Sequence, residues 1–467
     1  MRQPTSLAAL LGLGLASCSG ADPAESTGAS TSTTATTRSD PATTTTGLAT
    51  TSTGTPGETT STTTTTSGSS TTSASGTTDL TSSTGGSTTT TGNETDSSST
   101  STTGELACLT WEVVEGGLDA DYVNEVVRLD GAGFALAGRT KSKGAGLDDF
   151  WLLRLSEEGD VLADFTYGGA GQEVANTVAF APDDSALLAG IVATQENSVD
   201  GLMIGVSSDG DKLWELQLGD SDADHLMAAI PVGAGGFAVA GIRDRVAQGT
   251  GYFWLVRVDG GGGLLWTKTY GDDSDEQLAY DLVETEDGGF ALAGTNAGDF
   301  WLVRTNADGQ LKWDKTYGGP RYERALGVDL FEDGGFAIGG WAEENGASDF
   351  YLVRTDAAGD AVWQTTLDGD HSDLAEDVRV LDDGGVLVVG ATRPDGGTAD
   401  LWMAKVDALG ASVWDHRYGG SAYDGGRSVT EAASGDLVVV GRTDSKGAGM
   451  ADAWALRTAP NGDLRCP

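Results

Sequence analysis

The stretch "DGGFALAG" at residues 287–294 joins a tight Asp-Gly-Gly turn to a short alternating apolar run that ends in glycine. Close copies recur as "GAGFALAG" (131–138), "AGGFAVAG" (234–241), "DGGFAIGG" (333–340) and "DGGVLVVG" (383–390). The glycines that close these runs and two weaker copies, here called the marker glycines, are Gly138, Gly190, Gly241, Gly294, Gly340, Gly390 and Gly441. They lie 52, 51, 53, 46, 50 and 51 residues apart, which gives seven units with a period typical of solenoids and propellers.

Each unit has the same internal pattern of four short apolar runs. After the marker glycine comes a third run such as "DFWLVRT" (299–305), a turn such as "NADG" (306–309) and a fourth run such as "LKWDKTY" (311–317). Short runs rich in β-branched and aromatic residues, separated by Gly, Asp and Asn, are typical of antiparallel strands joined by tight turns. The sequence therefore predicts an all-β fold over residues 106–467, a seven-bladed β-propeller of four-stranded antiparallel blades.

The tryptophans keep two fixed positions in the repeat. On the third run they are Trp151, Trp254, Trp301, Trp402 and Trp454, and on the fourth run Trp111, Trp214, Trp266, Trp313, Trp363 and Trp414. Large rings at fixed positions are expected to pack between neighbouring blades. Trp111 fits the fourth run of the last unit, so we expect the N-terminal segment of the domain to complete that blade and remove the exposed strand edges. Only Trp341 lies off this register.

The repeat, with "DFWLVRTNADGQLKWDKTYGG" at residues 299–319, resembles the β-propeller repeats of secreted and surface bacterial proteins, most of which have no assigned activity. The element "NADGQLKW" (306–313) is also similar to the repeat of quinoprotein-type propellers, which include quinone-dependent dehydrogenases and a lipoprotein that helps to assemble outer-membrane proteins. The chain departs from that group because it has seven units in place of eight and no dehydrogenase cofactor motif. The resemblance implies a fold and no particular activity.

The N-terminus has the pattern of an export signal. Arg2 precedes a short apolar run, Leu7–Ala16, which is too short to span a bilayer. The residues Leu15-Ala16-Ser17-Cys18 resemble the lipobox of bacterial lipoproteins. That resemblance implies removal of residues 1–17 and lipidation of Cys18, and Ser19 after it implies the outer membrane. An ordinary signal peptide with a chance cysteine is the alternative.

Residues 18–105 are rich in Ser, Thr and Gly and contain almost no large apolar side chain. Such a segment cannot bury enough surface to offset the entropy of ordering, so we expect a disordered linker. A flexible coil of this length spans roughly 50 Å on average, and its composition also resembles that of O-glycosylated stalks. The expected role is a tether that holds the propeller away from the lipid surface.

The other two cysteines, Cys108 and Cys466, lie at the two ends of the repeat domain. An oxidising compartment permits a disulfide between them, and two free thiols are the alternative. In the chain-entropy description a bond that closes so long a loop stabilises by at most roughly 5–6 kcal/mol.

The charge and the motif search exclude several functions. There are 27 Lys and Arg against 70 Asp and Glu, for a formal net charge of −43, which repels nucleic acid and anionic membrane surfaces. The three histidines share no register, and no HExxH, GxSxG or phosphate-loop motif is present. We therefore expect no nucleic-acid partner, no cofactor and no sequence-encoded catalytic motif.

An acidic residue recurs at the start of the first run of each unit: Asp121, Glu173, Asp224, Glu276, Glu323, Asp373 and Asp424. These carboxylates could form a ring around the centre and hold a cation such as calcium. The favoured interpretation is structural, with each carboxylate accepting hydrogen bonds inside its own blade. Acidic turns such as "DGDHSD" (368–373) resemble loose calcium sites but lack the spacing of a calcium loop, so solvated turns are favoured there too.

The loop between the second and third runs varies most between units. Loops on a rigid scaffold commonly carry binding, so we predict a binding face here, and ordinary solvated loops are the alternative. Its candidate residues are Lys141, Lys143, Arg243, Arg245, Trp341, Arg393 and Lys446. The favoured hypothesis is a monomeric, lipid-anchored propeller, exposed on the cell surface, that binds a protein or glycan. The alternatives are a carboxylate-dependent hydrolase or lyase acting on polysaccharide and a periplasmic outer-membrane assembly factor.

Overall fold

The computed structural model describes residues 110–464, except 130, 194–197, 246–250, 273–274, 345, 370–371 and 395–396, and it describes residues 244 and 245 without their side chains. The expectations for the signal, for Cys18, for the linker, and for Cys108 and Cys466 lie outside the described residues. Every regular element in the described part of the chain is a strand. Within that part, no helix is long and apolar enough to cross a membrane.

Each repeat unit forms four consecutive strands, and the units are numbered one to seven in the order of their marker glycines. Units one and two contain β2 (Asp121–Leu129), β3 (Gly133–Thr140), β4 (Asp149–Leu155), β5 (Val161–Tyr167), β6 (Glu173–Phe180), β7 (Ala186–Ala193), β8 (Val199–Val206) and β9 (Lys212–Leu218). Units three and four contain β10 (Ala223–Pro231), β11 (Phe237–Arg245), β12 (Tyr252–Val258), β13 (Leu264–Tyr270), β14 (Gln277–Glu284), β15 (Phe290–Asn296), β16 (Asp299–Thr305) and β17 (Leu311–Tyr317).

Units five and six contain β18 (Tyr322–Leu330), β19 (Phe336–Glu344), β20 (Ala347–Thr355), β21 (Ala361–Leu367), β22 (Ser372–Val380), β23 (Val386–Arg393), β24 (Asp400–Val406) and β25 (Ser412–Tyr418). Unit seven contains β26 (Asp424–Glu431), β27 (Leu437–Thr443) and β28 (Asp452–Thr458). Its fourth strand is β1 (Trp111–Glu115), which pairs antiparallel with β28 and places Trp111 opposite Arg457.

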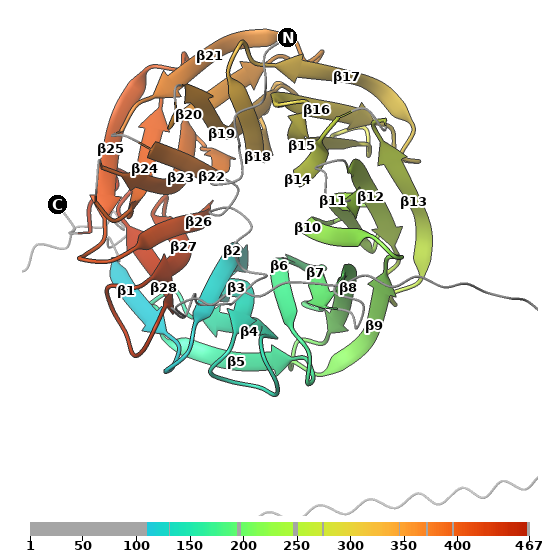
Figure 1. The fold of residues 1–467 in the computed structure, drawn as a ribbon, viewed down its shortest axis with the longest axis vertical. Helices are drawn as coiled ribbons and strands as arrows, with labels where there is room; N and C mark the ends of the chain where they lie inside the picture. The colour runs from blue at the N-terminus through green and yellow to red at the C-terminus, as the bar shows by residue number, and fades with distance from the viewer. Residues whose placement is uncertain are drawn as a thin grey trace, which may run out of the picture. The chain divides into compact units, whose positions relative to one another are not determined.

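The sheets repeat one antiparallel pattern. Among the described residues there are five four-stranded sheets and one eight-stranded sheet, in which the strands of units five and six are joined by a single parallel pairing, Ser348 with Ser372. The sheets follow one another around a common centre, with the first strand of each unit innermost, as β2, β6 and β10 show, and the fourth strand outermost (Figure 1). The all-β prediction is therefore confirmed, and the repeated four-stranded sheets are compatible with a β-propeller.

A close approach of two strands explains why each second strand ends its core run in glycine. The first strand has a bulge opposite the marker glycine, for example between Ala279 and Asp281 opposite Gly294. A β-carbon on Gly294 would lie 1.9 Å from the carbonyl oxygen of Leu278, and the other marker glycines face the same obstacle at 1.9–2.0 Å. No side chain fits there, so the repeated glycine follows from the bulge.

Aromatic rings fill the space between neighbouring sheets. Phe253 of unit three packs against Trp301 of unit four with 4.4 Å between ring centroids, and Phe350 of unit five packs against Trp402 of unit six at 4.2 Å. The third-strand indoles are buried, and Trp151, Trp254 and Trp454 are among the largest fully buried side chains. The core of the domain is therefore a series of inter-sheet layers, each built from two consecutive units.

Candidate functional site

The recurrent acidic residues at the start of the first strands are buried and serve the turn that enters each unit. Asp121 is fully buried and accepts hydrogen bonds from the hydroxyl of Thr140 (2.5 Å) and the backbone N–H of Gly117 (2.8 Å). Asp424 accepts from the N–H of Gly420 (2.7 Å) and from the hydroxyl of Ser445 (2.7 Å). The same bond from the residue four positions earlier reaches Glu173, Asp224 and Asp373. These contacts agree with the structural interpretation.

One member of the predicted acidic set is wrong by one residue. The register pairs Ala279 with Gly294, so the position equivalent to Asp121 in unit four is Gln277 and not Glu276. The side-chain oxygen of Gln277 accepts the N–H of Asp272 at 2.8 Å, which reproduces the turn contact of the other units. An extra residue in the entering turn of unit four causes the shift, and it leaves Glu276 to face its neighbours in unit five.

Two of the predicted basic residues are held by ion pairs beside an indole ring, and Lys143 of unit one also lies 3.8 Å from Glu115 of unit seven. The ammonium group of Lys143 lies 4.7 Å from the Trp151 ring and pairs with Asp164 at 2.6 Å. Lys446 repeats this arrangement, with its ammonium group over the Trp454 ring at 4.8 Å and ion-paired with Glu112. The repetition indicates that these lysines stabilise the second-to-third-strand loops.

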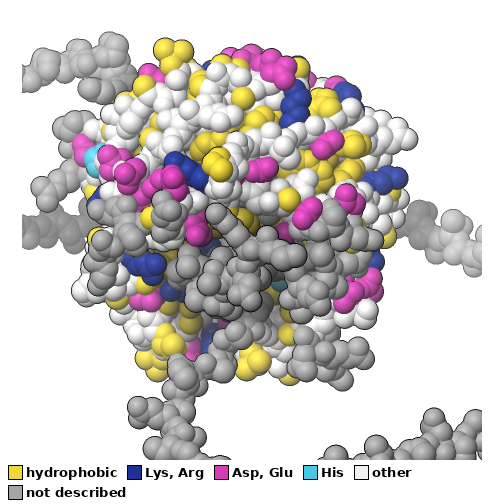
Figure 2. Space-filling model, turned by 45° about the horizontal axis from the view of Figure 1, so that its top comes forward, with side chains coloured by type: hydrophobic (Ala, Val, Ile, Leu, Met, Phe, Trp, Pro, Cys, Tyr) yellow, Lys and Arg dark blue, Asp and Glu magenta, His cyan; other side chains and the backbone are white. Residues whose placement is uncertain are grey.

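The other predicted basic residues do not converge. Arg243 pairs with Asp220 at 3.0 Å and lies over Trp254. Lys141 and Arg393 are exposed, and the side chain of Arg245 lies outside the described residues. On the face shown in Figure 2, acidic and basic side chains are interspersed and do not form one patch of a single sign.

Trp341 belongs to a compact cluster between units four and five. Its ring lies 5.7 Å from that of Tyr322, and the guanidinium of Arg324 lies 5.7 Å from each ring. Arg324 donates to the hydroxyl of Tyr322 (2.7 Å), which in turn donates to Glu276 (2.7 Å). Arg324 also pairs with Glu276 at 3.5 Å and lies 5.7 Å from the ring of Tyr280.

The cluster continues across units six, seven and one. Glu376 pairs with Arg427 at 2.7 Å; burial raises the pKa of Glu376, and the positive charges of Arg427 and Arg324 oppose that rise. The guanidinium of Arg442 then lies 4.2 Å from the ring of Tyr423 and 5.0 Å from that of Tyr122.

Arg139 closes the series, with its guanidinium 4.3 Å from the ring of Tyr122. We call these residues the arginine–tyrosine network: Tyr122, Arg139, Glu276, Tyr280, Tyr322, Arg324, Trp341, Glu376, Tyr423, Arg427 and Arg442.

The network lies at the end of the sheets that also carries the loops between second and third strands. The antiparallel register places the start of β2 beside the end of β3, with Asp121 opposite Thr140, and the other units repeat this pairing. The guanidinium-bearing Arg139 and Arg324 are only 7% exposed, whereas the rings of Tyr122, Trp341 and Tyr423 are half-buried. Partly exposed aromatic rings therefore lie over arginines whose orientation is fixed by carboxylates and hydroxyls.

Prediction from the sequence found Trp341, named Glu276 only as a structural acidic residue, and missed the rest of the network. A signal existed at the residue that follows each marker glycine: Arg139, Ile191, Ile242, Thr295, Trp341, Ala391 and Arg442. This position and the bulge position of the first strand change between units, while the marker glycine beside the first of them is the same in all seven. The prediction rested on the loops between second and third runs alone, so it did not include these strand positions.

A second group of polar residues, here called the inner carboxylates, joins consecutive first strands. Glu125 accepts the N–H of Val178 in the next unit at 2.7 Å, and Asp281 accepts that of Val328 at 2.8 Å. Asp329 and Asp377 do the same in their turn. Each inner carboxylate therefore ties its first strand to the backbone of the following unit.

Burial raises the pKa of Glu125 to about 7 and that of Asp281 to about 8. Arg379 moderates both shifts, and it lies 3.6 Å from Asp377, whose charge raises the pKa of the guanidinium. The charge of this one arginine therefore acts on carboxylates of several units.

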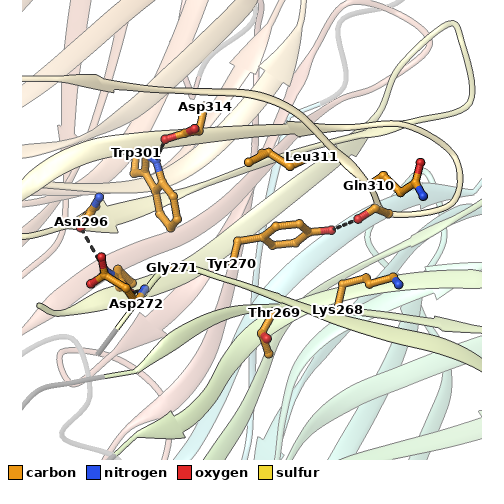
Figure 3. A pocket seen from close by; sticks show the side chains of 12 residues that line it. Lys268, Thr269, Tyr270, Gly271, Asp272, Asn296, Trp301, Gln310, Leu311 and Asp314 are labelled. Atoms are coloured by element: carbon orange, nitrogen blue, oxygen red, sulfur yellow. Dashed lines mark hydrogen bonds between the residues drawn. The ribbon is translucent and has the colours of Figure 1, made fainter. Parts of the chain in front are cut away.

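An open depression of about 580 Å³ lies between units three and four (Figure 3). Tyr270 and Trp301 are in its wall, but the hydroxyl of Tyr270 donates to the carbonyl of Gly309 (2.7 Å) and the indole of Trp301 to Asp314 (3.0 Å). These polar groups are engaged within the protein, and the depression contains none of the predicted binding residues. It is a weaker candidate than the network.

No protein-family model matches the chain, and no curated protein matches it in sequence. Solved structures with a similar arrangement include a protein of unknown function from Bacteroides caccae, with 12% identity over 62% of this chain and 97% of that chain and a TM-score of 0.40. A Lactobacillus plantarum protein gives 14% identity over 70% and 97%, with a TM-score of 0.44. Sqt1 of Chaetomium thermophilum bound to the N-terminus of the ribosomal protein L10 gives 12% identity over 74% and 98%, with a TM-score of 0.46.

Proposed function

We propose that the chain is a seven-bladed, monomeric β-propeller that is anchored to the outer membrane through Cys18 and binds a protein partner at the arginine–tyrosine network. The blade count is supported by the seven marker glycines and by the four strands of each unit, with β1 as the fourth strand of unit seven. The lipobox-like residues 15–18 and the Ser/Thr-rich linker support the anchor and the tether.

The observation that carries the binding proposal is the convergence of variable residues. The positions that differ between units bring Trp341, Tyr322 and Arg324 into mutual contact, although the repeat itself needs none of them. Tryptophan, tyrosine and arginine are the residues that dominate binding energy at protein interfaces. The arginines of the network are already oriented by carboxylates, as Arg324 is by Glu276. Little side-chain entropy of these arginines therefore remains to be lost when a partner binds.

A protein is favoured over a glycan because the charges of the network are matched in pairs, as in Arg324 with Glu276 and Arg427 with Glu376. Paired charges beside half-buried aromatic rings match the polar and aromatic composition of protein interfaces. Glycan binding is the competing outcome of the experiment below.

The experiment is affinity capture from the envelope by the full-length protein and by two variants, Trp341→Ala and Leu409→Ala. Leu409 is 83% exposed and lies in the turn between β24 and β25, outside the network, so it is the matched control. We expect a specific protein that is captured by the wild type and by Leu409→Ala and lost with Trp341→Ala, while all three unfold at the same temperature. Equal capture by Trp341→Ala, or capture of polysaccharide alone, contradicts the proposal.

The hydrolase alternative is less well supported, even though raised carboxyl pKa values are typical of catalytic acids. Glu125 and Asp281 have such values, but their oxygens accept backbone N–H groups of the next unit. The distinction between cell surface and periplasm is tested by adding protease to intact cells. Our proposal expects cleavage in the linker, whereas an assembly factor in the periplasm stays protected.

A further inference from the structure

A pair of carboxylates recurs where consecutive units meet. The aspartate at the start of a third strand lies beside the acidic residue that starts the next unit, and in each pair the negative charge of one member raises the pKa of the other. Five such pairs are Asp149–Glu173, Asp299–Glu323, Asp349–Asp373, Asp400–Asp424 and Asp452–Asp121. Acidic pairing is thus a general property of these junctions and does not by itself mark a site.

In four of these junctions a glycine leaves room for the pair. A β-carbon on Gly168 would lie 1.9 Å from an oxygen of Asp149, and one on Gly419 would lie 2.0 Å from an oxygen of Asp400. Gly116 and Gly318 occupy the same place in their junctions. The junction between units five and six departs from this rule, because the chain has Asp368 where the others have glycine.

Asp368 adds a third carboxylate to the pair formed by Asp349 and Asp373. One oxygen from each of the three side chains lies within 4.8 Å of the others. Two oxygens bound to one calcium ion at about 2.3–2.6 Å can be at most about 5 Å apart, so the spacing suits a shared calcium ion. Asp373 is fully buried, Asp349 is half-buried and Asp368 is exposed, which leaves one side open to solvent.

A buried hydroxyl beside the three carboxylates is an independent sign of a missing ligand. Thr392 is 1% exposed, and its Oγ1 has no hydrogen-bond partner. A β-carbon on Gly369 would lie 3.0 Å from this oxygen and 2.9 and 3.0 Å from the two oxygens of Asp373, so the hydroxyl and the carboxylate face the same small space.

The equivalent threonines of units one and seven are satisfied. Thr140 donates to Asp121, and Thr443 donates to Asp424. Unit six follows the three-carboxylate junction, and its equivalent threonine is Thr392. Among the described threonines at this position, Thr392 is the one whose hydroxyl donates no hydrogen bond to the acidic residue. A buried hydroxyl without a partner is costly, so the exception calls for a ligand that supplies one.

The local charge also favours a cation. The guanidinium of Arg321 lies 3.9 Å from Asp349 and is engaged at 2.6 Å by Glu344, and the guanidinium of Arg417 donates to the carbonyl of Gly369 at 3.0 Å. The junction is also where the hydroxyls of Ser348 and Ser372 meet at 3.1 Å in the parallel pairing of the two sheets.

We propose that Asp349, Asp368 and Asp373 bind one calcium ion, with the Thr392 hydroxyl beside them as a further oxygen donor. The ion links β20 to β22 and so restricts the motion of the hairpin formed by β19 and β20. Trp341 lies on β19 of this hairpin. Since the site needs no partner protein, it stands independently of the binding function proposed above.

The test is calcium binding to the full-length protein, measured by calorimetry and by thermal unfolding after treatment with a chelator. We expect one ion per chain with a Kd in the range of about 10⁻⁴–10⁻³ M or tighter, and a rise in Tm that magnesium at equal concentration does not reproduce. The decisive variant is Asp368→Gly, which restores the glycine of the other junctions. It should abolish calcium binding and, in chelator, unfold at a higher temperature than the wild type because a like-charge repulsion is gone.

Asp209→Asn is the matched control, since it removes a carboxylate from an exposed turn far along the chain. It should bind calcium like the wild type, and Thr392→Val should bind several-fold more weakly. Equal effects of calcium and magnesium, absence of binding in the wild type, or unchanged binding in Asp368→Gly each overturn the proposal.

Discussion

The indole of Trp341 lies against the phenol ring of Tyr322, with 5.7 Å between their centroids and the guanidinium of Arg324 beside both. Trp341 is the one tryptophan outside the two repeat positions, and it is only half-buried. We expect Trp341→Ala to weaken partner binding by at least about tenfold, the loss typical of an interface hot spot, and to leave the Tm nearly unchanged. Titration with the captured partner measures the loss of affinity, and thermal unfolding measures the Tm.

The close approach of each marker glycine to the first strand predicts that adding a single methyl group there lowers the stability strongly. Gly294→Ala places a β-carbon 1.9 Å from the carbonyl oxygen of Leu278, so strands β14 and β15 must separate. We expect a loss of about 3 kcal/mol in the free energy of unfolding. Gly260→Ala is the matched control, since nothing lies within 4 Å of that position. Equal stability of the two variants in urea would show that the bulge does not require the glycine.

A tyrosine at the end of several fourth strands ties its unit to the next. Tyr317 donates to the carbonyl of Gly359 at 2.7 Å, and Tyr167 and Tyr270 make the equivalent bond. Tyr317→Phe should cost about 1 kcal/mol, the net value of a buried hydrogen bond. The hydroxyl of Tyr351, which bonds to Gln364 in an exposed position, provides the control. Denaturant unfolding of Tyr351→Phe should match the wild type.

The inner carboxylates predict a pH dependence of stability. Glu125 and Asp281 have pKa values of about 7 and about 8 in the native state, above those of the unfolded chain. The native state therefore holds these protons more tightly, so their stabilising contribution is complete below about pH 4 and is lost as pH rises to about 8. Glu125→Gln should make the fall in stability between pH 5 and pH 8 shallower, by on the order of 1–2 kcal/mol.

Glu158→Gln, at an exposed position in the turn before β5, is the control for this change. It should leave the pH profile of the unfolding free energy as it is in the wild type. An identical slope for Glu125→Gln would mean that Glu125 is ionised in the native state at pH 5.

The ends of the domain predict the disulfide between Cys108 and Cys466. The hydroxyl of Thr110 donates to the carbonyl of Leu464 at 2.9 Å, two residues away from each cysteine. Peptide mapping of the non-reduced protein should recover the linked pair, and Cys108→Ser should lower the unfolding free energy by about 2–4 kcal/mol. Recovery of both cysteines as alkylated thiols from the exported protein would contradict the pairing.

The repeated features of this protein could be predicted because the same local contacts and steric limits recur in every unit. The alternating runs and the Asp-Gly-Gly turns fix strands and hairpins through contacts close in sequence, and the position of Trp111 indicated which strand it would join. The acidic starts of the units were predicted to be structural, and the turn contacts of Asp121 and Asp424 agree with that. The error at Glu276 arose because the turn before unit four has one extra residue. The acidic Glu276 therefore lies one position before the start of the repeat, which Gln277 occupies.

The candidate sites were decided by the tertiary structure. Arg324 and Glu376 are 52 positions apart, and Asp349 and Asp373 belong to different units, so no local pattern could bring them together. The sequence by itself determined the repeat, its strands and the glycine at each bulge, since these depend on period and on local sterics. Which variable side chains share one surface depends on the curvature that places the repeated sheets around a centre, and only the packed sheets supply it (Figure 1).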